Sequence, residues 1–395
     1  MSGPADSQRL RTVGVVTTSR ADYSHLYWVL RDLEDDPTVK PLIIVLGAHL
    51  TEEFGHAERE IERAGLPVHY RIECLLSSDT DVGMAKTIGV ATLGLADLLA
   101  RLRPDLLMLV ADRYEMLAPA AVALTLRVPI VHIEGGEVSE GAVDDAVRNA
   151  LTKMSHVHFT PTERARRRVL SMGEEEWRVH CVGAPSIDHL RRSELPSRDV
   201  VAAEIGFDVA GEQTIVVSTH PVTLARDTLR EADSLFGALA ATKTPVVFCF
   251  PNADSGSREL IRRAKVFCGT RPNTALCVNL RPPMFWALLR DAAVLLGNSS
   301  SGIMETPSLA LPCVNVGMRQ QGRERSLNII DVAPTIDGIR AGLDQALGHG
   351  FRASLAGMKS PYGDGRAAER IVQILRDIPL GEELLVKRTV PLSED

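Results

Sequence analysis

Six ionisable side chains lie within fourteen residues that follow a short apolar run, Val128–Val131. They are one histidine and five carboxylates: His132, Glu134, Glu137, Glu140, Asp144 and Asp145. The apolar run predicts a buried strand, and in an open parallel sheet the carboxyl ends of the strands are where ligands bind. Carboxylates at such a place cost stability unless they are solvated, paired or used. We therefore predict that acid/base chemistry is located in this stretch.

Two or three carboxylates that converge in a partly desolvated pocket separate their pKa values, so that one stays ionised as a base and another stays protonated as an acid. Glu134 lies between the predicted strand and the glycine pair Gly135–Gly136, which favours a functional role. Asp144 and Asp145 precede Arg148 at helical spacing, so a solvated ion pair on a helix surface is the alternative for them.

Two further strand ends carry an arginine where a helix is predicted to begin. Ser19-Arg20-Ala21-Asp22 follows the apolar run 12–18, and Asp112-Arg113 follows the apolar run 106–111. An arginine beside the free N–H groups of a helix start can bind a phosphate, and Asp112 can serve as an acid/base group. Helix capping and a local Asp112–Arg113 ion pair are the alternatives that the sequence leaves open.

In the second half, His220 ends the first predicted strand within the segment 218–221, where a hydrogen-bonding or charge-stabilising role is favoured. The segment 297–302 (GNSSSG) is a hydroxyl-rich turn between an apolar strand and a helix, which predicts a phosphate cradle. Glu305, one turn later, can accept hydrogen bonds from a ribose, and Arg319 adds a cation. A serine-rich helix cap explains neither Glu305 nor Arg319, so a nucleotide site is favoured.

Short apolar runs alternate with helix-length segments through both halves, which is typical of parallel sheets built from strand–helix–strand units. We predict an α/β fold of two Rossmann-like domains whose parallel sheets face a central cleft. Residues 1–190 form the domain with the carboxylates, 191–213 a linker, and 214–365 the nucleotide-binding domain. Residues 366–395 are expected to form a helix packed back on the first domain and a tail.

Composition narrows the classes of partner. A net charge of −7 without a basic run and 4% aromatic residues disfavour a nucleic-acid partner. We expect no window to reach the length of a membrane span, and the polar N-terminus lacks a signal core, so no membrane partner and a cytoplasmic location are predicted. The six cysteines are scattered, the histidines lack metal-ligand spacing and no Gly-x-Gly-x-x-Gly occurs. We therefore expect free thiols, no protein-bound metal and no dinucleotide cofactor.

Together these segments resemble the UDP-N-acetylglucosamine 2-epimerase family, in particular its hydrolysing, sialic-acid-pathway branch. The resemblance runs in order through both halves, from about residue 12 to about residue 376. It is carried by SRADYSHL at Ser19, ADRYEML at Ala111, HIEGGEVSEGAVDDAVRNALTKMSHVHF at His132, VGAPSID at Val182, STHP at Ser218, FPNADSGS at Phe250, GNSSSGIMETPSLALPCVNVGMRQQGR at Gly297 and SPYGDGRA at Ser360.

The resemblance implies a GT-B type fold with a site shared between both domains. The positions that match the family's catalytic groups are Asp112, Glu134, Asp144 and His220. The positions that match its substrate and UDP contacts are Arg20, Ala21, Arg113, Asn252, Ser299, Ser300, Glu305 and Arg319. Two positions depart from the family pattern: Asn149 replaces a histidine found in many hydrolysing members, and Ala111 replaces a common glycine.

The reaction that the resemblance implies is elimination of UDP across C1–C2 of a UDP-2-acetamido sugar, followed by addition of water with inversion at C2. The expected substrate is UDP-N-acetylglucosamine, which would give UDP and N-acetylmannosamine. The alternatives are a UDP-2,4-diacetamido-trideoxyhexose, a non-hydrolysing epimerase, a glycosyltransferase of the same fold and a non-catalytic nucleotide-sugar sensor. No cofactor is needed, although a divalent cation can accompany the diphosphate, and a homodimer or homotetramer is expected.

Overall fold

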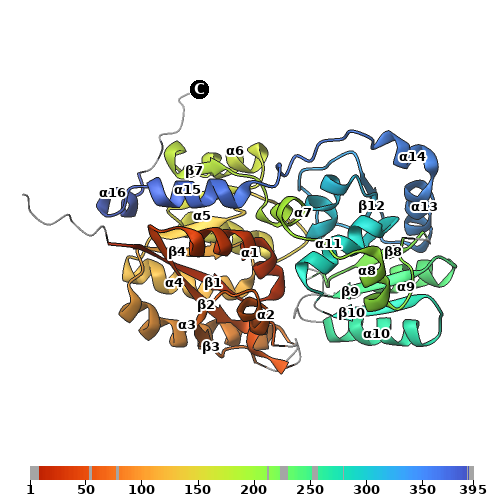
Figure 1. The fold of residues 1–395 in the computed structure, drawn as a ribbon, viewed down its shortest axis with the longest axis horizontal. Coiled ribbons are helices and arrows are strands. Elements are labelled where there is room, and N and C mark those ends of the chain that lie inside the picture. The colour runs from red at the N-terminus through yellow and green to blue at the C-terminus, as the bar shows by residue number, and fades with distance from the viewer. Residues whose placement is uncertain are drawn as a thin grey trace, which may run out of the picture.

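Two parallel sheets form the two lobes of the protein (Figure 1). The computed structural model describes residues 9–52, 56–76, 80–210, 213–222, 230–250, 257–278, 280–388 and 390. The strand order is β3-β2-β1-β4-β5-β6-β7 in the first sheet and β10-β9-β8-β11-β12-β13 in the second. Each order reverses direction beside its first strand, which places a topological switch point there. The predicted α/β fold of two Rossmann-like units is confirmed.

The first lobe contains the seven strands β1 (Arg11–Thr17), β2 (Val39–Leu46), β3 (Val68–Ile72), β4 (Leu106–Val110), β5 (Ile130–Ile133), β6 (Val157–Thr160) and β7 (Val179–Cys181). Its helices are α1 (Arg20–Asp35), α2 (Glu58–Arg63), α3 (Asp81–Leu102), α4 (Leu117–Leu126), α5 (Asp144–Met154), α6 (Glu163–Ser171) and α7 (Asp188–Arg192). β4 is buried over its whole length because helices cover both faces of the sheet. Such strands are continuous apolar runs, as the sequence shows.

The second lobe contains the six strands β8 (Ile215–Ser218), β9 (Val246–Phe250), β10 (Thr274–Val278), β11 (Val294–Gly297), β12 (Cys313–Val316) and β13 (Ile329–Val332). Its helices are α8 (Arg198–Ile205), α9 (Arg230–Ala240), α10 (Ser257–Gly269), α11 (Pro282–Asp291), α12 (Ser300–Met304), α13 (Ile336–Leu347) and α14 (His349–Ser354). A small apolar cluster that includes Trp286 and Tyr362 packs between the lobes. Both side chains are fully buried, so the lobes share part of their core.

The segment expected as a linker is divided between the lobes. α7 stays on the first lobe, where Arg192 pairs with Asp32 of α1 at 2.6 Å. α8 packs on α11 and buries Val201 and Ile205 in the second lobe. Those two residues are four apart and share a face of the helix, which gives this polar segment an apolar side. Only residues 193–197 lie between the two helices.

The chain returns to the first lobe at its C-terminal end, where α15 (Ala367–Asp377) packs against α1 (Figure 1). Ile371 and Leu375 of α15 belong to the core of the first lobe. α16 (Glu382–Leu385) follows, and the buried Arg178 donates to the carbonyl oxygen of Leu384 at 2.8 Å. The first lobe is therefore completed by residues that follow the second lobe in sequence.

Helix α3 differs from expectation. It has 22 residues and meets the length and hydropathy of a membrane span, so the prediction that no segment does so is wrong. One face carries Ala91, Leu95 and Leu99 into the core of the first lobe, beside α4. Within this structure α3 is thus an outer helix of an α/β lobe.

Candidate active site

The predicted site residues gather in two adjoining pockets between the lobes. The carboxyl ends of β1, β4 and β5 supply one wall, and those of β8, β11 and β12 supply the other. The two pockets share four lining residues, Ala21, His25, His220 and Ser300. They therefore form one continuous site.

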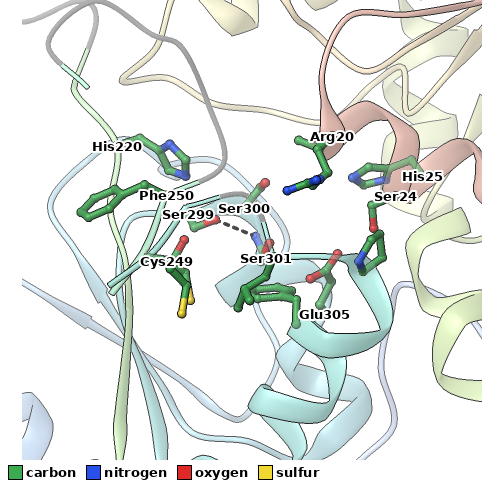
Figure 2. Close-up of a pocket in the computed structure, with 16 residues that line it drawn as sticks. Arg20, Ser24, His25, His220, Cys249, Phe250, Ser299, Ser300, Ser301 and Glu305 are labelled. Carbon is green, nitrogen blue, oxygen red and sulfur yellow. Dashed lines mark hydrogen bonds between the residues drawn. The ribbon is translucent and has the colours of Figure 1, made fainter. Parts of the chain in front are cut away.

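Eleven of the twelve predicted residues line this site. The pocket in Figure 2 is lined by Arg20, Ala21, His220, Ser299, Ser300 and Glu305. The second pocket adds the other five, which are Asp112, Arg113, Glu134, Asp144 and Arg319. The twelfth, Asn252, lies outside the described residues.

Helix α1 brings Arg20 and Ala21 to the site. Ser19 caps the helix, and the Asp22 carboxylate accepts from the backbone N–H of Thr18 at 2.9 Å. Both alternatives raised for this motif are thus realised together: Ser19 and Asp22 cap the helix, while Arg20 faces the pocket. In this structure Arg20 pairs with Glu60 of α2 at 2.5 Å.

The loops after β4 and β5 begin with strained backbone. Ala111 has φ of 56° and Glu134 has φ of 67°, a left-handed conformation that favours glycine. Ala111 occupies the position where the family commonly has glycine, so its departure costs backbone energy. Its carbonyl oxygen accepts from Nε2 of His132 at 2.8 Å, which fixes the tautomer of that buried imidazole. Burial lowers the pKa of His132 to about 4, so this histidine is neutral and structural.

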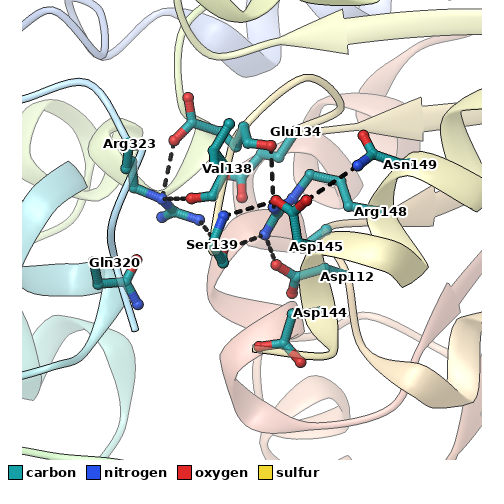
Figure 3. A network of polar contacts seen from close by, with 12 residues as sticks. Asp112, Glu134, Val138, Ser139, Asp144, Asp145, Arg148, Asn149, Gln320 and Arg323 are labelled. Atoms are coloured by element: carbon teal, nitrogen blue, oxygen red, sulfur yellow. Dashed lines mark hydrogen bonds and ion pairs between the residues drawn. The ribbon is translucent and has the colours of Figure 1, made fainter. Parts of the chain in front are cut away.

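The buried Arg148 holds the loop that carries the carboxylates (Figure 3). It forms an ion pair with Asp112, and it donates to the carbonyl oxygen of Glu137 and to the hydroxyl of Ser139, both at 3.1 Å. Burial is the main cause that lowers the pKa of Arg148, and the neighbouring Arg323 adds to it. A solvated surface pair with Arg148 was the alternative that the sequence left open for Asp144 and Asp145. Instead, Arg148 is the counter-ion inside the site.

The two neighbouring aspartates have different surroundings. Asp145 accepts from the backbone N–H of Ser139 at 2.8 Å and from Asn149 Nδ2 at 3.2 Å, so it organises the loop. Asp144 lines the pocket and forms an ion pair with Arg319 of the second lobe at 3.1 Å. The departure at Asn149 therefore affects a loop contact of Asp145 and reaches the pocket through that loop.

His25 is a site residue that sequence analysis missed. Its Nδ1 lies 2.7 Å from Oε1 of Glu134. Burial alone would lower the pKa of His25, but Glu134 outweighs it, followed by Glu305, and raises the pKa to about 9. Burial likewise opposes ionisation of Glu134, yet His25 and Arg323 lower the pKa of that carboxyl. Its spacing in the sequence could have revealed it, because His25 lies four residues after Ala21 and therefore on the same face of α1.

Two ion pairs join the segment after β5 to the loop after β12, and Figure 3 shows Arg323 of that loop reaching toward this segment. Arg323 Nε lies 3.1 Å from Glu137 Oε2, and Arg319 pairs with Asp144. The backbones also touch, because a Cβ added to Gly141 would lie 2.6 Å from Arg319 Cα. Only glycine permits that approach. Arg319 and Arg323 thus pair with carboxylates of the same first-lobe segment, so the loop after β12 approaches that segment as a unit.

The second-lobe wall is built from small residues after β8 and β11. Gly297 has φ of 141°, and a Cβ there would lie 2.0 Å from the carbonyl oxygen of Ser218. Asn298 accepts from the backbone N–H of His220 at 2.7 Å and donates to its carbonyl oxygen at 2.9 Å, which orients the His220 segment. Ser299 then caps α12.

Glu305 ends α12 as a buried carboxylate. Burial raises its pKa, while His25 and hydrogen bonds from serine hydroxyls act in the opposite direction. Its Oε2 atom is buried without a hydrogen-bond partner among the described residues. A buried acceptor without a donor is costly, so a donor group on a ligand would satisfy it.

The model of the UDP-N-acetylglucosamine 2-epimerase family matches residues 31–376. The chain belongs to this family. A relative from Legionella pneumophila, named UDP-N,N'-diacetylbacillosamine 2-epimerase (hydrolyzing), is 37% identical over 379 residues, covering 96% of this chain and 99% of the relative. A Campylobacter jejuni relative, named GDP/UDP-N,N'-diacetylbacillosamine 2-epimerase (hydrolyzing), is 34% identical and covers 81% and 84%.

Solved structures of UDP-N-acetylglucosamine 2-epimerases share the fold. The Neisseria meningitidis structure, bound to UDP-GlcNAc, has a TM-score of 0.77 at 18% identity and covers 92% of this chain and 99% of that one. The structure from Methanocaldococcus jannaschii, in complex with UDP-GlcNAc and UDP, has a TM-score of 0.74 at 19% identity, with the same coverage. The GT-B type architecture of the epimerase family is thus that of this chain.

The site of this epimerase-family chain divides by chemistry. Asp112, Glu134 and Asp144 lie on the first lobe, whereas serine hydroxyls, backbone N–H groups, Glu305 and the two arginines Arg319 and Arg323 lie on the second. Among the described residues, no group of three or more His, Cys, Asp or Glu side chains could hold a metal ion. The first wall suits proton transfer on a ring, and the second suits binding of phosphates and hydroxyls.

Proposed function

We propose that this chain is a hydrolysing 2-epimerase of a UDP-2,4-diacetamido-trideoxyhexose. The observation that carries the proposal is the 37% identity, over nearly the full length of both chains, to a hydrolysing enzyme named for such a sugar. The Campylobacter relative is named for the same sugar. A Neisseria meningitidis relative named UDP-N-acetylglucosamine 2-epimerase is 31% identical over 323 residues. The diacetamido sugar therefore replaces UDP-N-acetylglucosamine as the favoured substrate.

The two walls support a division of the substrate between the lobes. The UDP moiety would lie on the second lobe, with its phosphates near Ser299, Ser300 and Arg319 and its ribose near Glu305. The sugar would then reach the second pocket, among the carboxylates. Its C1–O bond would lie near His220 and Ser300, which line both pockets. This placement puts donors and cations on the departing diphosphate and carboxylates around the ring.

The reaction that we propose begins with removal of the proton on C2 and departure of UDP from C1, which leaves a C1–C2 double bond. Water then adds at C1, and a proton returns to C2 from the opposite face. The charge that develops on the departing diphosphate is stabilised by fixed donors and cations. No electron enters or leaves, so we propose no redox cofactor. Any divalent cation would arrive with the diphosphate.

Glu134 is the base that we favour for C2. It is buried, it lines the sugar pocket, and its ion pair with His25 keeps it ionised. Asp112 and Asp144 are held by Arg148 and Arg319, and we assign them to water and to the returning proton. Binding of the diphosphate to Arg319 would release Asp144 from its ion pair, which links substrate binding to the freeing of a carboxylate.

The test is product analysis in deuterated water with two substrates, a UDP-2,4-diacetamido-trideoxyhexose and UDP-N-acetylglucosamine, followed by NMR. The expected result is UDP and a free sugar, inverted at C2 and carrying deuterium there, with a higher kcat/KM for the diacetamido sugar. A higher kcat/KM for UDP-N-acetylglucosamine would identify that sugar nucleotide as the preferred substrate instead. A product that retains UDP would identify a non-hydrolysing epimerase, and tight binding without turnover would identify a sensor.

A further inference from the structure

Two cysteines lie side by side in the second-lobe wall of the active site. Cys249 of β9 and Cys277 of β10 are direct partners in the parallel register of these two strands. Both side chains line the pocket in Figure 2, where Cys249 is labelled. The mechanism that we propose above uses neither of them.

The two side chains share one face of the sheet and contact each other. Cys249 belongs to the apolar cluster that contains Met284 and Leu288 of α11, and Cys277 packs against the same cluster. A hydrogen bond joins the two thiols. Cys277 is half-buried, whereas Cys249 is only 5% exposed. One thiol is therefore accessible from the pocket, and its partner lies beside it in the wall.

The spacing of the two strands suits a disulfide. Neighbouring strands lie about 4.7–4.9 Å apart, and the Cα atoms of a disulfide are usually about 4.4–6.8 Å apart. The Cβ atoms of a disulfide approach to about 3.5–4.5 Å, so bond formation would draw the carboxyl ends of β9 and β10 slightly together. A disulfide that distorts its surroundings is strained, and strained disulfides are the easily reduced ones. The pair is thus suited to reversible oxidation.

The two thiols differ in acidity. The hydrogen bond from Cys249 lowers the pKa of Cys277, although burial and Glu204 act in the opposite direction. The same contact raises the pKa of Cys249. Burial raises the pKa of the four remaining cysteines, which are Cys74, Cys181, Cys268 and Cys313. Because the thiolate is the nucleophile in disulfide exchange, Cys277 is the thiol that would attack first.

We propose that Cys249 and Cys277 are a redox-active dithiol whose oxidant is a low-molecular-weight disulfide. The Cys277 thiolate attacks one sulfur of the oxidant, which forms a mixed disulfide and releases a first thiolate. Cys249 gives its proton to that thiolate and attacks the sulfur of Cys277, which releases a second thiolate. The products are the protein disulfide, one small thiol and one small thiolate. The protein loses two electrons, and the oxidant gains them.

Oxidation of the pair would act on the nucleotide pocket. Phe250 and Leu280 also line this pocket, and they follow the two cysteines closely in the sequence. Movement of the strand ends would therefore reshape the wall. The next step rests on the proposed function: with UDP in this pocket, the reduced form binds UDP more tightly than the oxidised form. Linkage then requires UDP to favour the reduced form by the same factor.

The first experiment is mass spectrometry of the full chain after equilibration with oxidised and reduced glutathione, with free thiols alkylated before digestion. We expect a disulfide between Cys249 and Cys277 in wild type, and glutathione attached to Cys277 in Cys249→Ser. Cys268→Ser on α10 is the matched control and should form the same disulfide as wild type. Free Cys249 and Cys277 in the most oxidising buffer, or glutathione attached to neither of them, overturns the dithiol.

The second experiment compares UDP binding to reduced and oxidised wild type by calorimetry, which requires no variant to fold. We expect oxidation to weaken UDP binding roughly tenfold, and saturating UDP to raise the reduction potential of the pair by about 30 mV, which is the same factor for two electrons. The oxidant should leave UDP affinity unchanged when both cysteines are replaced by serine. Equal UDP affinities of the two wild-type forms overturn the link to the nucleotide. A reduced chain that binds no UDP contradicts the proposed function, whereas the dithiol is judged by the mass of its disulfide.

Discussion

The two walls of the active site differ in the kinds of polar group that they present to the pocket. The first-lobe wall, after β4 and β5, contains buried or partly buried carboxylates held by Arg148, His25 and Arg319, and two of its residues have strained backbone. The second-lobe wall, after β8 and β11, presents serine hydroxyls and backbone N–H groups fixed by Asn298. Buried charge needs a counter-ion, whereas neutral donors need only geometry. In the reaction that we propose, proton transfer belongs to the first wall and ligand binding to the second.

The largest expected effect comes from neutralising the first wall. Glu134→Gln should lower turnover about a hundred- to ten-thousandfold, which is the usual contribution of a general acid or base. Asp112→Asn and Asp144→Asn should lower turnover as well, while calorimetry should find UDP affinity nearly unchanged in Glu134→Gln and Asp112→Asn and no weaker in Asp144→Asn, which frees Arg319 for the diphosphate. Glu140→Gln, on the exposed part of the same loop, is the control and should retain activity. Wild-type turnover in any of the three would remove that carboxylate from the mechanism.

The ion pair between His25 and Glu134 should make stability depend on pH. The folded-state pKa of His25 is about 9, above the unfolded value of about 6.5, so its contribution is complete below pH 6.5 and is lost as the pH rises through 9. The shift corresponds to about 3 kcal/mol. Between pH 6 and pH 10 wild type should therefore lose about 3 kcal/mol more stability than His25→Gln. Urea denaturation at several pH values measures this, and parallel losses in both proteins would contradict the ion pair.

Changes on the second wall should affect binding more than turnover. Glu305→Ala should weaken UDP binding roughly tenfold or more, because a hydrogen bond to a buried charged acceptor is lost. Ser300→Tyr should weaken it by filling the pocket that both subsites share. Ser354→Ala on α14, far from the site, is the control. Calorimetry that finds unchanged UDP affinity in both site variants would place the nucleotide elsewhere.

The sequence predicted the residues of the two walls to different extents. On the second wall, the serines and Glu305 lie in one continuous segment at the end of β11, and they were found because strand, turn and helix follow one another within the sequence. On the first wall the carboxylates were found as local clusters at strand ends. Their partners His25 and Arg323 were missed because they come from α1 and from the other lobe. Contacts between residues far apart in the sequence leave no local pattern.

The fold shows a similar limit. The alternation of strands and helices predicted both sheets, because apolar runs covered on both faces have a clear pattern. The sequence could not assign α8 to the second lobe, since Val201 and Ile205 indicate only that one side of that helix is buried. The apolar residues of α3 are visible in the sequence, but composition does not show which of them face outward and which pack on the lobe. Periodicity in the sequence shows that one face of a helix is apolar, but it does not show which part of the protein packs against that face.

The smallest predicted effect tests the strain on the first wall. Ala111 has φ of 56°, which costs a non-glycine residue about 1–2 kcal/mol, so Ala111→Gly should relieve it. Part of that gain is lost, because glycine increases the entropy of the unfolded chain by about 0.4–1 kcal/mol. The net expectation is a stabilisation of about 0.5–1 kcal/mol, seen in urea denaturation.

Ala121→Gly on α4 is the matched control for this change, since Ala121 is exposed and lies in a helix. It should destabilise the protein by about 0.5–1 kcal/mol, so the two alanine-to-glycine changes have opposite signs. Equal losses in both variants would show that Ala111 is not strained. If Ala111→Gly is more stable and also slower, the strained backbone holds Asp112 in place for turnover. Nothing equivalent is expected on the second wall, where the residue with positive φ at the end of β11 is already a glycine, Gly297.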